Sequence, residues 1–481
     1  MANDIVNRNV RSARIDRVDT TGDTLTSRAG LSLFARYLQE TGVLDALGNH
    51  FGKLRGSAKS PPVVEVFKQL FCFLLDGTSR HLCYFDRLQK DAGYAANIES
   101  TPDCLLSSHG IKRFLQKLGG KGYQLGFRSL LQELWLWRLR VERPAVVELG
   151  LDSMVMDNDE APARHGVQPT YKKVKGFHPL QLTWGRYLVD GVFRGGSHHC
   201  NHGQTAQTML RKAVSVIRRY DPQVPIVVRL DAGFLDETIF KTCQELGIAF
   251  ICSGKMYKNI KAFVGQAAAS DWHDYANRQQ KWDYLDFTDQ RGTWKHPWRA
   301  LYLRPRYEGQ QTLLEYARPE TILYTNLGHG TEIDEVWHAA GQSHWLEAPR
   351  IIQSSHDRGA DELVHRAFKD FGFEQLPFER FHPNGAMYYS MVAAFFMFEA
   401  FKYDVCDPQQ EPKAQLQSVA GCGIKLTAYA STVRRQLLDV AGKIVRTAHN
   451  VYLKVTPADW DRLDWGVLWR RCTTPPRICI S

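Results

Sequence analysis

Two short apolar runs that each end in an aspartate are the feature that most restricts how this chain can fold. The first is residues 146–152, Val-Val-Glu-Leu-Gly-Leu-Asp, and the second lies within residues 224–234 and leads to Asp231. Apolar runs of this length that stop at a polar residue are typical of buried strands. Such strands present Asp152 and Asp231 at their carboxyl ends, where ligands bind in open α/β sheets.

A third carboxylate, Glu362, lies in a stretch of helical periodicity. Arg358, Glu362 and Lys369 stand at positions i, i+4 and i+11, and eleven steps of about 100° return to within about 20° of the starting direction. The three side chains therefore form one column, and the adjacent Asp361 points about 100° away from it. Two strand-end aspartates and a helix glutamate are the ligands that a pair of Mg²⁺ ions needs for phosphoryl transfer.

The bulk composition predicts a cytoplasmic protein of two or three domains, since 481 residues exceed one small core. A net charge of +10 favours a polyanionic partner, although many basic proteins bind no nucleic acid. The ten cysteines form no Cys-x-x-Cys pair and are typical of reduced core thiols. The N-terminus has no apolar signal segment, and the longest apolar run, residues 391–398, is too short to cross a bilayer.

Residues 1–145 are predicted to be a helical DNA-binding region preceded by a polar arm. Residues 107–117 form a short amphipathic helix that begins with serines and carries Lys112 and Arg113 on its outer face. This helix fits the second helix of a helix-turn-helix, and it equally fits a solvated basic face.

Residues 146–254 alternate between extended and helical patterns. Three extended segments are followed by helix, strand, helix and strand, which predicts an α/β sheet of mixed direction. Residues 351–406 return to helical periodicity and complete this core with the Glu362 helix. The chain between Asp231 and Glu362 is far longer than a strand-to-helix connection requires.

Residues 255–350 account for that extra length and are predicted to be a β-rich insertion. Its expected short aromatic strands are residues 281–287, 298–304, 312–316 and 321–324. The insertion's tryptophans are expected mostly in the core.

Residues 407–481 are predicted to be a C-terminal basic segment. A polar linker over residues 407–417 precedes a basic helix over residues 432–447 and a strand over residues 451–455. The basic residues of that helix are Arg434, Arg435, Lys443 and Arg446.

Three motifs in a fixed order give the chain a resemblance to a known family. They are Leu151-Asp152-Ser153, then Arg229-Leu230-Asp231-Ala232-Gly233-Phe234, then Arg358-Gly359-Ala360-Asp361-Glu362 followed seven residues later by Lys369. With these motifs the chain resembles DDE transposases of bacterial insertion sequences, in the group typified by insertion sequence 1380, over nearly its whole length. One departure is Ser355, where the related motif often has tyrosine, and it bears on contacts with flanking DNA.

The resemblance implies an RNase H-like mixed sheet with a β-rich insertion and a helical DNA-binding region. The implied enzyme binds terminal inverted repeats in double-stranded DNA, cleaves at the element ends and joins the 3′ hydroxyls to target DNA. Asp152, Asp231 and Glu362 would hold two Mg²⁺ ions, for which Mn²⁺ can substitute. A dimer on paired ends, associated with the nucleoid of a bacterium, is expected.

Basic residues near the three carboxylates are candidates for DNA contacts. Arg358 and Lys369 would grip phosphates beside the scissile bond, or else pair and be solvated on the helix face. A loop soon after the first strand could contact the transferred strand or simply be solvated. Its residues are Tyr171, Lys172, Lys173 and Lys175.

Residues 197–202 contain three histidines and a cysteine but are not expected to bind zinc. Adjacent ligands give poor tetrahedral geometry, and no second ligand pair lies nearby, so a loop that lines the site is expected. Two other functions stay open: an RNase H-like nuclease that cleaves without joining, and a DNA-binding protein with a silent catalytic site. The presence of all three carboxylates argues against the second.

Overall fold

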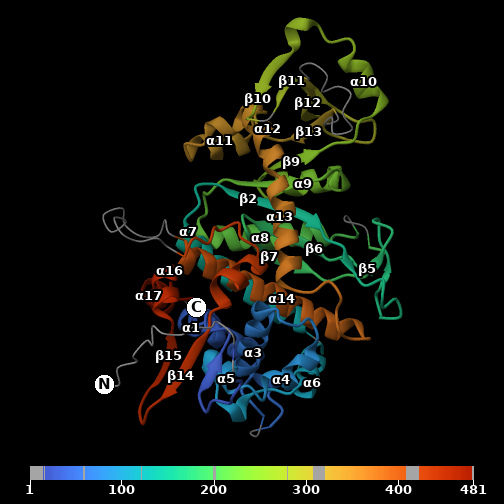
Figure 1. Cartoon of the computed structure of the whole chain (residues 1–481). Coiled ribbons are helices and arrows are strands. Elements are labelled where there is room, and N and C mark those ends of the chain that lie inside the picture. The colour runs from blue at the N-terminus through green and yellow to red at the C-terminus, as the bar shows by residue number, and fades with distance from the viewer. Residues whose placement is uncertain are drawn as a thin grey trace.

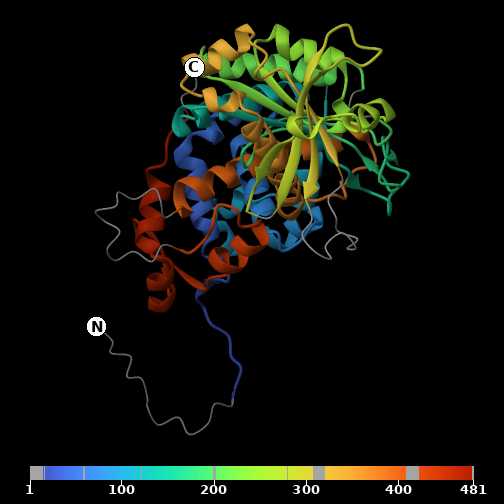
Figure 2. The ribbon, with the colours of Figure 1, turned by 90° about the horizontal axis from the view of Figure 1, so that it is seen from above.

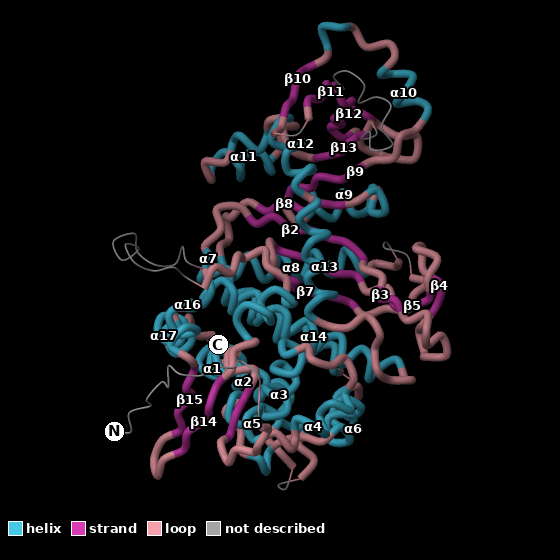
Figure 3. The backbone as a smooth tube through the Cα atoms, in the orientation of Figure 1, coloured by secondary structure: helices cyan, strands magenta, loops and turns pink. Residues whose placement is uncertain are grey.

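The computed structural model describes residues 15, 17–57, 60–120, 122–198, 202–278, 280–306, 320–407 and 422–478. Strands are concentrated in one half of the molecule, and helices predominate in the other (Figures 1 and 3). The insertion and the N-terminal helices lie at opposite ends, so the insertion strands stand in front of these helices in the view from above (Figure 2). Within the described ranges, every helix is too short or too polar to span a membrane.

The core is a nine-stranded sheet in the order β10-β11-β12-β13-β9-β8-β2-β6-β7. Five of its strands are β2 (Val147–Ser153), β6 (Leu180–Trp184), β7 (Tyr187–Val192), β8 (Ile226–Leu230) and β9 (Ala249–Ser253). β6 pairs antiparallel with β2 and β7, whereas β8 is parallel to both β2 and β9. β2, β6 and β7 form an antiparallel meander, and β8 and β9 are added in parallel on the other side of β2. This is the RNase H-like arrangement, which confirms the expected fold class.

Both faces of the parallel strands are covered, which explains their continuous apolar sequence. On one face, α8 (Thr205–Tyr220) and α9 (Glu237–Glu245) follow β7 and β8, and Phe240 of α9 stacks on Phe250 of β9 with ring centroids 4.1 Å apart. On the other face, Ile251 joins a second buried cluster.

The insertion extends this sheet rather than forming a sheet of its own. β13 (Thr321–Thr325) pairs antiparallel with β9, and the following strands are β12 (Trp298–Arg306), β11 (Lys281–Asp289) and β10 (His273–Ala276). The expected strand over residues 312–316 lies outside the described residues. The helices of this part are α10 (Lys258–Val264), α11 (Glu332–Ala339) and α12 (Ala348–Asp357).

One buried helix, α14 (Phe381–Phe401), joins the N-terminal helices to the sheet (Figure 1). It stacks Tyr389 on Phe127 and Phe396 on Tyr187 of β7, and a helix that is apolar on every side belongs in an interior. The N-terminal helices are α1 (Leu31–Thr41), α2 (Val43–Phe51), α3 (Val63–Asp76), α4 (Phe85–Leu88), α5 (Ala92–Asn97), α6 (Ser108–Leu118) and α7 (Tyr123–Glu142).

The predicted basic helix over residues 432–447 is wrong in its second half. α15 (Ala430–Val433) and a π-helical turn (Arg434–Leu438) are followed by β14 (Gly442–Arg446), which pairs with β15 (Val451–Val455). The helix stops because β-branched residues in β14 pair on both sides, with β15 and with β1 (Thr24–Thr26). The predicted strand over residues 451–455 is confirmed. Two helices follow it, α16 (Pro457–Leu463) and α17 (Trp465–Thr473).

Arg434 is a structural residue that ties three segments together. Its guanidinium donates to the carbonyls of Leu74 and Leu75, in the last turn of α3, at 3.0 and 2.7 Å. It also donates to those of Asp370 and Phe371, at the end of α13 (Gly359–Phe371), at 3.2 and 2.9 Å. Carbonyls in the last turn of a helix have no partner within it, so one cation caps two helices.

Replacing Arg434 with alanine should therefore destabilise the whole chain. We expect Arg434→Ala to lower the free energy of unfolding by about 3 kcal/mol, because a charged donor is lost and buried carbonyls are orphaned. Urea unfolding measures this change. The neighbouring exposed Arg435 supplies the control, and Arg435→Ala should stay within about 0.5 kcal/mol of wild type. Equal effects of the two substitutions would contradict the capping role.

Candidate active site at the carboxyl edge of the sheet

Asp152 and Asp231 lie side by side because their strands run parallel. Leu151 of β2 pairs with Leu230 of β8, so each aspartate is the next residue along its chain. Asp231 leaves the sheet at once, and its carboxylate accepts a hydrogen bond from the backbone of Gly233 at 2.8 Å. The structure thus brings the two strand-end carboxylates together at the expected edge.

Arg358 lies between the two aspartates. One of its terminal nitrogens is 3.3 Å from Asp152 Oδ2 and 3.8 Å from Asp231 Oδ2, so the two oxygens are at most about 7 Å apart. Burial raises the pKa of both carboxyl groups, and the charge of Arg358 partly opposes the rise. The charge of Asp152 further raises the pKa of Asp231. The guanidinium thus neutralises a carboxylate pair that would otherwise repel.

Two cavities meet at Asp152. One, of about 300 Å³, is lined by Asp152, Glu362 and Lys369, and the other, of about 440 Å³, by Asp152 and Asp231. The column predicted on the helix is therefore present, since Arg358 contacts the aspartates while Glu362 and Lys369 face the cavity. Within the described residues, no three His, Cys, Asp or Glu side chains are close enough together to hold a metal ion as they stand.

Asp361 points away from this site, as its helical position predicts. Its Oδ1 accepts from Arg229 at 2.9 Å, and both side chains are buried. A Cβ on Gly150 of β2 would come within 2.6 Å of Asp361 Oδ2, so only glycine permits this approach. Asp361 therefore anchors the first turn of α13 to the sheet.

Lys369 is paired within the protein as well as facing the cavity. Its Nζ lies 2.6 Å from Glu374 Oε2, and both side chains are about one-third exposed. A partly exposed pair of this kind contributes little to stability, so Lys369 can exchange Glu374 for a phosphate at small cost.

A short basic hairpin borders both cavities. It is formed by β4 (Gln168–Pro169) and β5 (Lys175–Phe177), which with β3 (Met156–Asp157) make a small separate sheet. The turn is closed by hydrogen bonds between Thr170 and Val174. Tyr171 and Lys172 line the cavity beside Asp152, whereas the other two predicted contact residues, Lys173 and Lys175, are exposed on the same hairpin.

Lys112 and Arg113 are exposed on α6, in the N-terminal region and away from the carboxylates (Figure 1). α6 begins at a capping serine, since Ser107 accepts a hydrogen bond from Gly110 at 3.2 Å. The segment between α5 and α6, residues 98–107, is longer than the three or four residues of a helix-turn-helix turn. The helix is thus a basic surface helix outside that motif.

The sequence family described as "Transposase DDE domain group 1" matches residues 8–459, nearly the whole chain. The chain belongs to this family of DDE transposases. Enzymes of the family cleave and transfer DNA with divalent metal ions. Assignment to the narrower insertion sequence 1380 group stays a prediction.

One solved structure overlaps with most of the chain at low similarity. A cryo-EM structure of the piggyBac transposase synaptic complex with hairpin DNA aligns over 84% of this chain and 89% of that chain, with 10% sequence identity and a TM-score of 0.32. No curated protein matches the chain.

His365 is a residue of the candidate site that the sequence patterns did not single out. It lies one turn after Glu362, lines the cavity with Asp152, and is 8% exposed. Burial lowers the pKa of His365 to about 4, and the charge of Lys369 lowers it further, so the imidazole is neutral at pH 7. Its position at i+7 from Arg358, within the same helical column, is the signal that would have found it.

The loop over residues 197–202 borders the site in part, as expected. His198 lines the cavity that contains Asp152 and Asp231, and its carbonyl accepts from His178 Nδ1 at 2.7 Å. Residues 199–201 lie outside the described residues.

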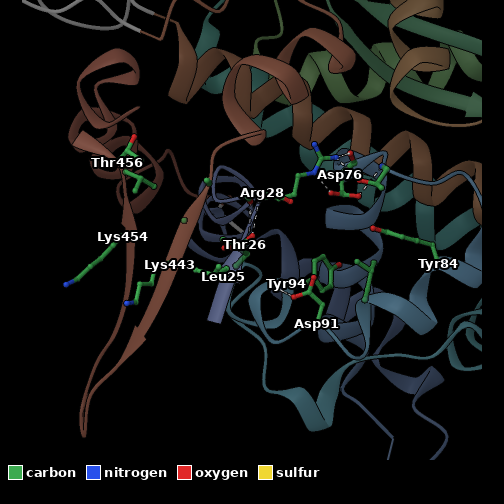
Figure 4. Close-up of a pocket in the computed structure, with 17 residues that line it drawn as sticks. Leu25, Thr26, Arg28, Asp76, Tyr84, Asp91, Tyr94, Lys443, Lys454 and Thr456 are labelled. Atoms are coloured by element: carbon green, nitrogen blue, oxygen red, sulfur yellow. Dashed lines mark hydrogen bonds and ion pairs between the residues drawn. The ribbon is translucent and has the colours of Figure 1, made fainter. Parts of the chain in front are cut away.

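A larger cavity, of about 770 Å³, lies far from these carboxylates, between the β1–β14–β15 sheet and the N-terminal helices (Figure 4). Its acidic groups are committed to structural contacts. Asp76 pairs with Arg28 at 2.7 Å, and Asp91 caps α5 by accepting from Tyr94 at 2.9 Å. Size alone therefore does not identify the site of chemistry in this transposase.

The buried neutral His365 predicts a pH dependence of stability. Its pKa is about 4 in the folded protein and about 6.5 when unfolded, so the unfolded chain binds more protons between these values. The free energy of unfolding therefore keeps its full value above pH 6.5 and falls as the pH is lowered towards 4. The fall between pH 7 and pH 5 is about 2 kcal/mol. In urea unfolding, His365→Gln should lack this part of the fall in the free energy of unfolding. The variant His449→Gln, at an exposed site, should keep it. An unchanged decline in His365→Gln would refute the assignment.

Proposed function

We propose that this transposase binds the terminal inverted repeats of its own element, cleaves at the element ends and joins the 3′ hydroxyls to target DNA. The observation that carries the proposal is the convergence of Asp152, Asp231 and Glu362 on two adjoining cavities at the carboxyl edge of the sheet. A basic hairpin borders the same cavities, as a site for a phosphodiester substrate requires.

The three carboxylates fit a site for two Mg²⁺ ions, with Mn²⁺ as a substitute. Carboxylate oxygens suit these hard cations, and the Arg358 guanidinium already occupies the position of a cation between Asp152 and Asp231. Within the described part of the chain the side chain of Glu362 makes no hydrogen bond or ion pair, so this exposed side chain is free to turn towards Asp152. When bound, such ions activate the attacking oxygen and stabilise the leaving oxygen.

The surrounding cations position DNA in this proposal. Without substrate, Arg358 neutralises the aspartate pair, and with substrate it turns to a phosphate beside the scissile bond. Lys369 exchanges its contact with Glu374 for a second phosphate. The hairpin residues Tyr171, Lys172, Lys173 and Lys175 contact the transferred strand.

Binding of the element ends falls to the N-terminal helical region over residues 1–145, in which Lys112 and Arg113 of α6 face solvent. Exposed cations that form no ion pair within the described residues are suited to phosphate contacts. Pairing of two element ends calls for a dimer on DNA, in the cytoplasm and at the nucleoid of a bacterial cell.

The alternative of an RNase H-like nuclease shares the same site and differs only in the joining step. Strand-transfer assays with pre-cleaved ends separate the two. A silent DNA-binding protein is less consistent with three carboxylates that converge on one cavity edge.

The decisive experiment compares wild type with Glu362→Gln on a duplex that carries the element's own end. We expect Mg²⁺-dependent cleavage to fall by more than about 100-fold while binding of the end persists, because a metal ligand is lost and no phosphate contact changes. The matched surface substitution Glu245→Gln on α9 should cleave as wild type does.

Cleavage by Glu362→Gln at the wild-type rate would exclude Glu362 as the third ligand and turn attention to Asp361. A wild-type protein that binds the end but never cleaves it, with Mg²⁺ or Mn²⁺, would overturn the proposed activity in favour of a DNA-binding protein.

A further inference from the structure

The chain that enters the insertion leaves the sheet directly beside Asp231. β9 is parallel to β8, with Cys252 opposite Leu230, and Cys252 Sγ lies 3.5 Å from the carbonyl oxygen of Asp231. Neighbouring strands are about 4.8 Å apart. The residues that follow Ser253 therefore start at the same edge as the carboxylates, one strand further along.

Four cations gather at this exit around Tyr257. Lys255 precedes the tyrosine, Lys258 and Lys261 follow it on one face of α10, and all three lysines are exposed. Arg291 reaches the same place from the loop after β11, with its guanidinium 4.4 Å from the Tyr257 ring centroid. We name these four residues the α10 patch.

The cations of the α10 patch have no ion-pair partner in the described part of the chain. The nearby carboxylates are occupied. Glu237 accepts from the backbone of Lys295 and of His296 at 2.7 and 2.9 Å, and Asp289 accepts from the hydroxyl of Tyr324 at 2.7 Å. Clustered like charges that form no ion pair within the protein are the footprint of a polyanion site.

The side chain of Arg291 is also fixed by contacts with aromatic rings. Besides Tyr257, its guanidinium stacks on the ring of Trp294 at 4.9 Å, and Trp294 packs edge-on against Tyr324 of β13. Stacking on two rings fixes the direction of the guanidinium. A rigidly presented arginine suits a phosphate that arrives in a fixed position.

The α10 patch and the β4–β5 hairpin stand on opposite sides of the carboxylates. Along the edge the strands run β6, β2, β8 and β9, with Asp152 on β2 and Asp231 after β8. The hairpin lies between β2 and β6 in the chain, and the α10 patch follows β9 (Figure 1). A duplex laid across this edge passes over both aspartates and meets one basic element on each side.

We propose that the α10 patch binds the phosphate backbone of the duplex on one side of the cleavage point, while the hairpin binds the other side. This inference rests on the proposed function of the carboxylate site. It assigns the insertion a positioning role, in which two separated basic contacts hold the scissile phosphate over Asp152 and Asp231.

The test uses Lys258→Ala/Lys261→Ala in the full-length protein, with Lys212→Ala/Arg219→Ala on α8 as a control that removes the same charge elsewhere. On an intact duplex of the element end with its flanking DNA, the α10-patch variant should bind roughly tenfold more weakly at physiological salt. Its plot of log affinity against log salt concentration should lose a slope of about two. The control should match wild type, and both variants should keep the wild-type melting temperature.

Two shortened duplexes, each ending at the cleavage point from one side, locate the contact. The binding defect of the α10-patch variant should vanish on one of them, and that of Lys172→Ala/Lys173→Ala should vanish on the other. Wild-type cleavage of the intact duplex together with equal binding by the α10-patch variant and the control would overturn the inference and leave the proposed function standing. Failure of wild type to cleave would overturn both.

Discussion

The buried ion pair between Arg229 and Asp361 sets the geometry on which the active site depends. Arg229 precedes Asp231 by two residues on β8, and Asp361 directly precedes Glu362 on α13, so this contact fixes the distance between two catalytic candidates. Arg229 also reaches Glu148 of β2 at 3.3 Å. Burying two charges brings little net stability, but removing either partner leaves the other uncompensated. The pair therefore holds α13 at one position relative to β8. The segments that carry Asp231 and Glu362 thus contact each other through Arg229 and Asp361, beside the three candidate carboxylates.

The position of α13 also places a positive charge beside the carboxylates. Asp152 and Asp231 are close enough to repel, and the helix that carries Glu362 also carries Arg358 to the point between them. His365, on the next turn, stays neutral and adds no charge to the cavity. The carboxylate pair is therefore balanced by a charge from the protein itself.

Sequence patterns predicted those parts of the site that depend on local periodicity. The strand ends at Asp152 and Asp231 and the column on α13 follow from residue spacing alone, because strands and helices have fixed repeats. Lys443 was misplaced on a helix because its strand is specified by β1, from the other end of the chain. Arg434 was predicted only as a basic residue of the C-terminal helix, and tertiary packing alone shows that its partners are helix-end carbonyls. The lysines around Tyr257 are visible in the sequence, but the arrival of Arg291 from beyond β11 is not.

The pairing of β1 with β14 has a consequence for how the protein is made. The strand at Thr24–Thr26 is synthesised long before its partner at Gly442–Arg446. Until that segment is made, the N-terminal region has an unpaired β1 and an uncapped end of α3. Pairings between such distant segments close slowly and leave unfinished surfaces available for association. Completion of this part of the molecule is thus coupled to synthesis of the segment that holds Arg434 and β14, and a chain that stops before Arg434 lacks the shared helix cap and leaves β1 without its partner strand.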